Sequence, residues 1–306
     1  MLLRSPSITS KHLSLKHSDM SIYDKDLLSG LDKVQTAIKR IQMYCANKKV
    51  LVAFSGGKDS QCCYHLAKMA GIDFSAQYSI TRFEPPELIQ FIRKEYPDVI
   101  FRRAYKMSLY RQIEKYGLPN RFYRYCCDAK HKKTEGFDIA VIGVRAQESA
   151  KRAANWRMFG QKQDRSYYIC PIIDWTEKDV WEFLNSNNIQ HCKLYDEGYS
   201  RIGCVLCPLS MKMHKQDIER YPKIVNLLRN AFYAYYEKKK QEGFKTRTGK
   251  VIEYLKNQSK EECFNNWVWG GMHVISDTRS VEDEEPCLFA GTGFSESDGQ
   301  HSDDNL

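Results

Sequence analysis

The residues best suited to chemistry are six consecutive positions that follow an apolar run and contain two serines, two glycines, a lysine and an aspartate. Adjacent glycines let the backbone approach a phosphate, and the positive end of a helix that begins there attracts it. We therefore predict a phosphate-binding turn. Its spacing differs from the Gly-x-x-x-x-Gly-Lys-Ser/Thr pattern of P-loop nucleoside triphosphatases. The residues are Ser55, Gly56, Gly57, Lys58, Asp59 and Ser60.

Asp59 is unusual in this turn because a carboxylate and a phosphate repel each other. A bound Mg²⁺ would explain its presence, and so would a cap in which the carboxylate accepts a hydrogen bond from a backbone N–H of the turn. The alternative for the whole segment is an ordinary glycine turn between a strand and a helix. Six specific residues after one apolar strand favour the phosphate site over that alternative.

A second charged segment, residues 143–149, follows the strand expected near Val144. It would lie at the carboxyl edge of the sheet, where open α/β folds bind their ligands. Arg145 and Arg152 can make bidentate contacts with phosphate or sulfate. Three alternative roles are open for Glu148: it binds the nucleotide, it caps the next helix, or it pairs with an arginine. A solvated basic loop is the alternative interpretation.

Four cysteines form two close pairs, Cys126 with Cys127 and Cys204 with Cys207. Thiolates three residues apart can bind one metal centre from a turn, and a second pair brought close by folding would complete four sulfur ligands. Zinc, a redox dithiol and chance all remain open for the Cys-x-x-Cys pair alone. The chain has 11 cysteines and no recognisable secretion signal, so we expect reduced thiols and a cytoplasmic location. Cys62 and Cys63 are interpreted as buried apolar residues.

The elements that must position these residues alternate between strand and helix. Short β-branched runs indicate buried parallel strands, and apolar residues at steps of three and four indicate helices. This order predicts an α/β fold with a doubly wound, mostly parallel sheet. The expected strands are 50–54, 75–80, 98–102, 138–144 and 167–173. The expected helices are 24–46, 59–70, 86–96, 108–116 and 177–185, with a further helix from 222 onward.

Composition divides the chain into four parts: a flexible tail over 1–23, a nucleotide-binding domain with the cysteine site over 24–209, a helical extension over 210–280, and an acidic disordered tail over 281–306. The last part contains eight acids and no lysine or arginine, which leaves 47 basic and 30 acidic residues, a net charge of +17, in the rest. A field of that sign attracts nucleotides, nucleic acid or an acidic protein, or serves solubility alone. No apolar run approaches the roughly 18 residues of a membrane span.

The Ser-Gly-Gly-Lys-Asp-Ser loop resembles the pyrophosphate loop of the adenine nucleotide α-hydrolase superfamily, which includes ATP pyrophosphatases and the phosphoadenosine phosphosulfate (PAPS) reductase family. The resemblance implies that the loop binds an adenine nucleotide: ATP, adenosine phosphosulfate (APS) or PAPS. It also implies chemistry at the α-phosphate or at the sulfonyl group, with Lys58, Asp59 and Arg145 as catalytic candidates. Residues 143–149 resemble the family's substrate-binding segment. In residues 81–87, Glu84 and Glu87 are further candidates.

Several segments resemble the iron–sulfur branch of the PAPS reductase family. They are Arg124-Tyr-Cys-Cys127 with Lys130, and the stretches 171–181, 194–199 and 202–208. The resemblance implies a [4Fe–4S] cluster on all four cysteines, with Lys130 or Arg124 tuning its charge. The matching region covers roughly half of the chain, from about residue 50 to 209.

Two departures from that family shift the expected substrate toward ATP. The loop has the form seen in family members that cleave ATP, and the family's C-terminal Glu-Cys-Gly-x-His motif is missing. The nearest replacement is Glu262-Cys263, so Cys263 is a weak candidate nucleophile. We expect an ATP-using sulfur-transfer enzyme, with Mg²⁺ bound to ATP and a nucleic acid or sulfur-donor protein as possible partner. The alternatives are a sulfonucleotide reductase that uses Cys263, and a non-catalytic subunit that binds nucleotide and cluster.

Overall fold

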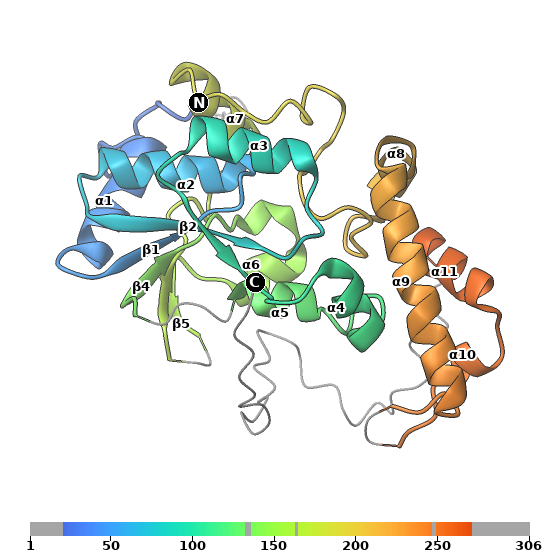
Figure 1. The fold of residues 1–306 in the computed structure, drawn as a ribbon. Helices are drawn as coiled ribbons and strands as arrows, with labels where there is room; N and C mark the ends of the chain where they lie inside the picture. The colour runs from blue at the N-terminus through green and yellow to red at the C-terminus, as the bar shows by residue number, and fades with distance from the viewer. Residues whose placement is uncertain (1–20, 132–135, 163–164, 247–248, 271–306) are drawn as a thin grey trace, which may run out of the picture.

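The computed structural model describes residues 21–131, 136–162, 165–246 and 249–270 (Figure 1). Its centre is a six-stranded sheet in the order β3-β2-β1-β4-β6-β5, in which every neighbouring pair is parallel except β5 with β6. The predicted α/β class with a mostly parallel sheet is therefore confirmed. The strands are β1 (Val50–Ala53), β2 (Phe74–Ile80), β3 (Ile100–Arg103), β4 (Ile139–Val141), β5 (Phe159–Gln161) and β6 (Tyr167–Ile169).

The direction of winding reverses between β1 and β4. From β1 the chain proceeds through β2 to β3 at one edge, and it then returns to add β4 on the other side of β1, with Val50 in register with both Phe74 and Ile139. Connections that leave in opposite directions open a crevice at the carboxyl ends of these two strands. The predicted phosphate loop follows β1 and the charged segment 143–149 follows β4, so both border this crevice.

Helices pack against the sheet through one large apolar core. This core includes β1 residues Val50 and Val52 together with Cys62 and Cys63, both of which are fully buried as predicted. The α2 helix packs against α1 and α7. The helices before the C-terminal part are α1 (Lys33–Cys45), α2 (Lys58–Met69), α3 (Pro86–Glu95), α4 (Leu109–Tyr116), α5 (Tyr125–His131), α6 (Ala150–Asn155) and α7 (Glu177–Ser186).

The prediction of a first helix from residue 24 is wrong at its start, because α1 begins only at Lys33. Asp32 caps it and accepts a hydrogen bond from the Gln35 N–H at 2.6 Å, while Gly30 has a φ of 65° that interrupts any helix before it. Leu27, which the periodicity places on the buried stripe, is fully exposed. The antiparallel strand β5 was not expected, since its three residues give no periodic signal.

Past residue 210 the chain forms four α-helices in its described part: α8 (His214–Arg220), α9 (Pro222–Gln241), α10 (Glu253–Lys256) and α11 (Lys260–Trp269). Figure 1 shows α9 and α11 side by side at one end of the molecule. They share a second apolar core with α4, and the Trp267 indole N–H donates to the Pro119 carbonyl at 2.7 Å. The two predicted tails lie outside the described residues, except for residues 21–23. In the described part, no helix is long and apolar enough to cross a membrane.

A buried carboxylate joins α7 to α1. Asp179 caps α7 together with Thr176, and it lies 2.6 Å from the Lys33 ammonium. Burial alone would raise the pKa of Asp179, but hydrogen bonds from Lys33 and Thr176 outweigh burial and hold this pKa below its usual range. The charged form of Asp179 therefore stabilises the fold.

We expect Asp179→Asn to lower the free energy of unfolding at neutral pH by about 1–3 kcal/mol, because a charge-assisted hydrogen bond is lost in a buried place. Since the folded pKa is lowered, this stabilisation exists above the unfolded-state pKa and disappears as the pH falls through the folded one. Denaturant unfolding of wild type and Asp179→Asn at a series of acidic pH values measures this loss of stabilisation. Glu242→Gln, which removes an exposed partner of Lys239, is the control. If the difference in free energy of unfolding between wild type and Asp179→Asn grew as the pH fell, the charged form of Asp179 would not be the stabilising one.

Candidate functional site

The phosphate loop is a tight turn held by its own serines. Gly56 has a φ of 73°, and a Cβ atom there would lie 2.6 Å from the Leu88 side chain, so only glycine fits. The Ser60 hydroxyl donates to the Gly57 carbonyl at 2.8 Å and accepts from the Ser55 N–H at 3.1 Å. Gly57 is the N-cap of α2 and has no capping side chain. The turn therefore presents the N-terminus of α2 at the carboxyl end of β1.

Lys58 is buried at the start of α2 and is tied to two later parts of the chain. Its Nζ lies 3.2 Å from Glu177 Oε1 and donates to the Ser200 carbonyl at 3.3 Å. Its backbone N–H donates to the Tyr195 hydroxyl at 3.0 Å. Burial raises the pKa of Tyr195 above its ordinary value, so this hydroxyl stays protonated. The lysine thus joins the loop to the segment that leads into Cys204.

Asp59 pairs with Arg145, which comes from the segment after β4. The Arg145 Nε donates to Asp59 Oδ1, and the guanidinium is almost fully buried. This ion pair explains the carboxylate in the turn in a way that the sequence did not suggest. Glu148 accepts from the Arg145 N–H at 3.1 Å and lies 2.8 Å from Arg152, so the pairing of Glu148 with an arginine is observed. A role for Arg152 in phosphate binding stays a prediction.

The close approach of β4 to α2 depends on Gly143. A Cβ atom there would lie 2.8 Å from the carbonyl carbon and oxygen of Asp59. We expect Gly143→Ala to push the two segments apart, to destabilise the protein by about 1–3 kcal/mol and to weaken ATP binding. Thermal unfolding and calorimetric titration with ATP measure the two effects. Gly203→Ala, where nothing lies within 4 Å of the added methyl group, is the stability control. Unchanged stability and affinity in Gly143→Ala would be evidence against this packing.

The two cysteine pairs come from separate elements that folding brings together. Cys126 and Cys127 lie in the first turn of α5, and Cys204 and Cys207 lie in the loop before α8. All four are free thiols. Lys130, one turn after Cys126, has its ammonium 3.7 Å from Cys204 Sγ and 3.1 Å from Glu84 Oε1. Lys130, one of the two residues predicted to lie beside the cysteines, therefore contacts Cys204.

The charges of the four sulfurs affect one another. A hydrogen bond with Cys127, together with burial, raises the pKa of Cys126, and the three other sulfurs add to the rise. The same hydrogen bond, with Lys130 and Arg124, lowers the pKa of Cys127 to about 6 although burial opposes it. Burial raises the pKa of Cys204 to about 12, against the effect of Lys130. Across the described ranges, however, no three histidine, cysteine, aspartate or glutamate side chains are arranged to hold a metal ion.

The other candidates have structural partners. Glu84 accepts hydrogen bonds from the backbone of Thr81 and Arg82 in addition to its ion pair, which places it at the edge of the cysteine site. Glu87 pairs with Arg220 at 2.8 Å and accepts from the Tyr221 hydroxyl, which links α3 to the C-terminal helices.

Cys263 belongs to α11 and is buried in the second core. Burial raises the pKa of its thiol to about 11. A cysteine nucleophile acts as an accessible thiolate, and neither condition holds for this residue. The structure therefore gives no support for a catalytic role of Cys263.

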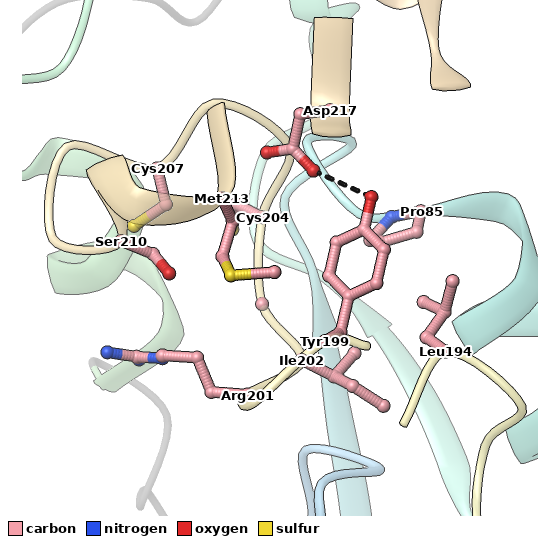
Figure 2. Close-up of a pocket in the computed structure, with 11 residues that line it drawn as sticks. Pro85, Leu194, Tyr199, Arg201, Ile202, Cys204, Cys207, Ser210, Met213 and Asp217 are labelled. Atoms are coloured by element: carbon pink, nitrogen blue, oxygen red, sulfur yellow. Dashed lines mark hydrogen bonds between the residues drawn. The ribbon is translucent and has the colours of Figure 1, made fainter. Parts of the chain in front are cut away.

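Sequence reasoning missed Tyr195, Ser200 and Glu177 as neighbours of Lys58. Tyr195 lies within the stretch 194–199 that carried the family resemblance, but no residue type there indicates contact with a loop 137 positions earlier. A pocket lies beside the Cys-x-x-Cys turn (Figure 2). Arg201, Ser210 and Met213 line it together with Cys204 and Cys207.

Comparison with known proteins agrees with this geometry. Residues 49–210 match the model of the phosphoadenosine phosphosulfate reductase domain, so the chain belongs to the PAPS reductase domain family. An uncharacterized protein of Methanocaldococcus jannaschii is 29% identical over 227 residues, which are 66% of this chain and 53% of that protein. The adenosine 5'-phosphosulfate reductase of Lysinibacillus sphaericus is 29% identical over 136 residues, 40% of this chain and 57% of that protein.

A crystal structure of a PAPS reductase from Candida auris is 13% identical, covers 66% of this chain and 98% of its own, and has a TM-score of 0.42. The chain spans about half the length of the first curated relatives that it matches.

Proposed function

We propose that this chain is an enzyme of sulfur chemistry that binds an adenine nucleotide on Ser55–Ser60 and acts at its α-phosphate, as an ATP pyrophosphatase does. The observation that carries the proposal is the meeting of Lys58, Asp59 and Arg145 at the crevice between β1 and β4. Membership in the PAPS reductase domain family supports an adenine nucleotide as the ligand. The intact loop favours ATP.

In this mechanism the turn and the N-terminus of α2 hold the phosphates, and Gly56 and Gly57 permit their close approach. The Lys58 ammonium neutralises the charge that develops on the leaving pyrophosphate. Arg145, oriented by Asp59, lies where it can bind the α-phosphate. An acceptor oxygen attacks the α-phosphorus, the bond between the α-phosphorus and the bridging oxygen breaks, and pyrophosphate leaves. Mg²⁺ is expected to enter with the phosphates of ATP.

We further propose that Cys126, Cys127, Cys204 and Cys207 hold a [4Fe–4S] cluster. All four cysteines are free thiols, and the pKa of Cys127 is lowered. The Lys130 ammonium lies beside Cys204. These properties suit an iron–sulfur cluster, because its ligands are thiolates. A bound cluster would supply redox chemistry or a sulfur-handling centre next to the nucleotide. Zinc on the same residues is the alternative. The acceptor, either a nucleic acid or a small molecule, and a sulfur-donor protein partner remain predictions.

A sulfonucleotide reductase is the second candidate, because several relatives of this chain are named adenosine 5'-phosphosulfate reductase. Such an enzyme would need a thiolate to attack the sulfonyl sulfur. The burial of Cys263 counts against that residue. Full sulfite production by Cys263→Ser would remove it from the reaction.

The deciding experiment is anaerobic incubation of the purified chain with ATP, APS and PAPS in parallel, with pyrophosphate, AMP and sulfite measured in each. Pyrophosphate and AMP from ATP alone would support the proposal. Sulfite from APS or PAPS with a thiol donor would favour the reductase. Nucleotide binding without any product would identify a non-catalytic subunit.

A further inference from the structure

The positive charge of the protein is concentrated in two segments. Residues 102–131 contain eight lysines and arginines and two acids, and residues 200–216 contain three and none, which gives the two segments a net charge of +9. The first segment is compact, because the rings of Tyr105, Tyr116 and Tyr125 pack together with centroids 5.1 to 6.3 Å apart. About half of the net charge of residues 1–280 therefore lies in these two segments.

The two basic segments touch each other and the end of α11. The Arg121 Nε donates to the Pro208 carbonyl at 3.5 Å, and its Nη2 lies 3.9 Å from Met211 Sδ. A Cβ atom on Gly270, the residue after α11, would collide with Met211 Cε. Residues 119–122, 208–212 and 267–270 thus form one junction, to which residues distant in the sequence contribute.

The exposed side chains of this junction are cationic, aromatic or aliphatic. We call them the junction surface: Arg121, Phe122, Leu209, Lys212 and Trp269. Trp269 is 62% exposed, Phe122 45% and Leu209 40%. The three segments contain no acidic residue, and among the described residues no carboxylate pairs with Arg121 or Lys212. A partner can therefore contact rings and cations together.

This composition selects the kind of partner. An apolar protein surface would bury the charges of Arg121 and Lys212 without a counter-charge, which is costly. An acidic peptide would neutralise the cations and leave the rings of Phe122 and Trp269 without a matching contact. A single-stranded nucleic acid satisfies both, since its bases stack on aromatic rings and its phosphates pair with cations. Duplexes hide the faces of their bases, whereas loops and ends of RNA present them unstacked.

We propose that the junction surface binds a single-stranded stretch of RNA, with bases stacked on Trp269 and Phe122 and phosphates paired with Arg121 and Lys212. Leu209 follows Cys207 by two residues, so the bound strand passes beside the cysteine turn. The inference rests on the proposed function, for which it names the acceptor as RNA.

The test is fluorescence anisotropy of the full chain with a labelled oligouridine of about 12 nucleotides, a length that one single-strand site can cover. Trp269→Ala should weaken binding about tenfold, because a base loses its stacking partner. Lys212→Gln should weaken binding and lower the slope of log affinity against log salt concentration by about 0.7, as expected for one lost phosphate contact. Oligouridine should also quench the intrinsic tryptophan fluorescence of the wild type more than that of Trp269→Ala.

Two matched controls remove similar side chains elsewhere. Tyr167→Ala removes a ring of 44% exposure from β6, and Lys48→Gln removes an exposed lysine before β1. Both variants should keep the wild-type affinity for oligouridine. Trp269→Ala and Lys212→Gln should keep the wild-type affinity for ATP, because neither residue borders the phosphate loop.

Wild-type affinity for oligouridine in a variant that combines Trp269→Ala and Lys212→Gln would overturn the inference. So would duplex RNA that binds as tightly as the single strand, since stacking would then contribute nothing. Equal affinity for polyglutamate would assign the surface to an acidic protein, and tighter binding of the matching oligodeoxyuridine would assign it to DNA. The proposed function fails separately, through absence of pyrophosphate release from ATP in a wild-type chain that binds oligouridine.

Discussion

Replacing Lys58 by alanine is expected to lower the rate of pyrophosphate release from ATP by a factor of about a hundred to a thousand. The ammonium is buried at the start of α2, where a charge acts more strongly on a developing negative charge than it does in water. It is also a donor that can turn from Glu177 and the Ser200 carbonyl toward a phosphate. Steady-state assay of pyrophosphate under anaerobic conditions measures the change.

Lys68→Ala is the matched control, because Lys68 lies near the other end of α2 and its ammonium is about half exposed. That variant should keep the wild-type rate. Because Lys58 is buried, circular dichroism and thermal unfolding should accompany the assay, and Lys58→Gln provides a variant of similar shape. A folded Lys58→Gln protein with full activity would show that the loop lysine has no role in turnover.

The second large effect is expected for Cys204→Ser, which should remove most of the bound iron. A serine hydroxyl is a poor replacement for a thiolate ligand, and loss of one ligand opens the centre to solvent. Anaerobic purification followed by elemental analysis, acid-labile sulfide determination and a visible absorption spectrum measures the cluster. We expect iron and sulfide in the wild type and a colourless protein in the variant.

Cys192→Ala is the control, because Cys192 is a fully buried thiol near the site that the proposal does not use. Its metal content should equal that of the wild type. If the wild type contained zinc and no acid-labile sulfide, the four cysteines would form a structural zinc site and not a cluster site. Identical iron content in Cys204→Ser and wild type would exclude Cys204 as a ligand.

Local patterns along the chain were enough to predict much of the fold. The apolar run before Ser55 predicted β1, and the helices predicted over 86–96 and 177–185 correspond to α3 and α7. These signals are local because capping and burial alternation act within a few residues. The start of α1 was predicted wrongly, since an apolar periodicity through Leu27 outweighed the break at Gly30.

The turn between β1 and α2 was predictable for the same reason: its six residues are consecutive, and their types predict an anion site at a helix N-terminus. The partners of that loop were not. The pairing of Arg145 with Asp59 was not predicted, and neither was the contact of Tyr195 with the loop. Both contacts join segments more than 80 positions apart, whose distance depends on the strand order.

The sequence by itself therefore determined the class of the sheet, the glycine turn between β1 and α2 and the two cysteine pairs, because each is encoded by neighbouring residues. Only the tertiary structure decided that β4 lies beside β1, which brings Arg145 to Asp59, and that the chain around Ser200 lies against Lys58. It also decided that Cys263 is buried in the second core. The physical reason is that burial and long-range ion pairs depend on how whole elements pack, and no local pattern specifies that packing.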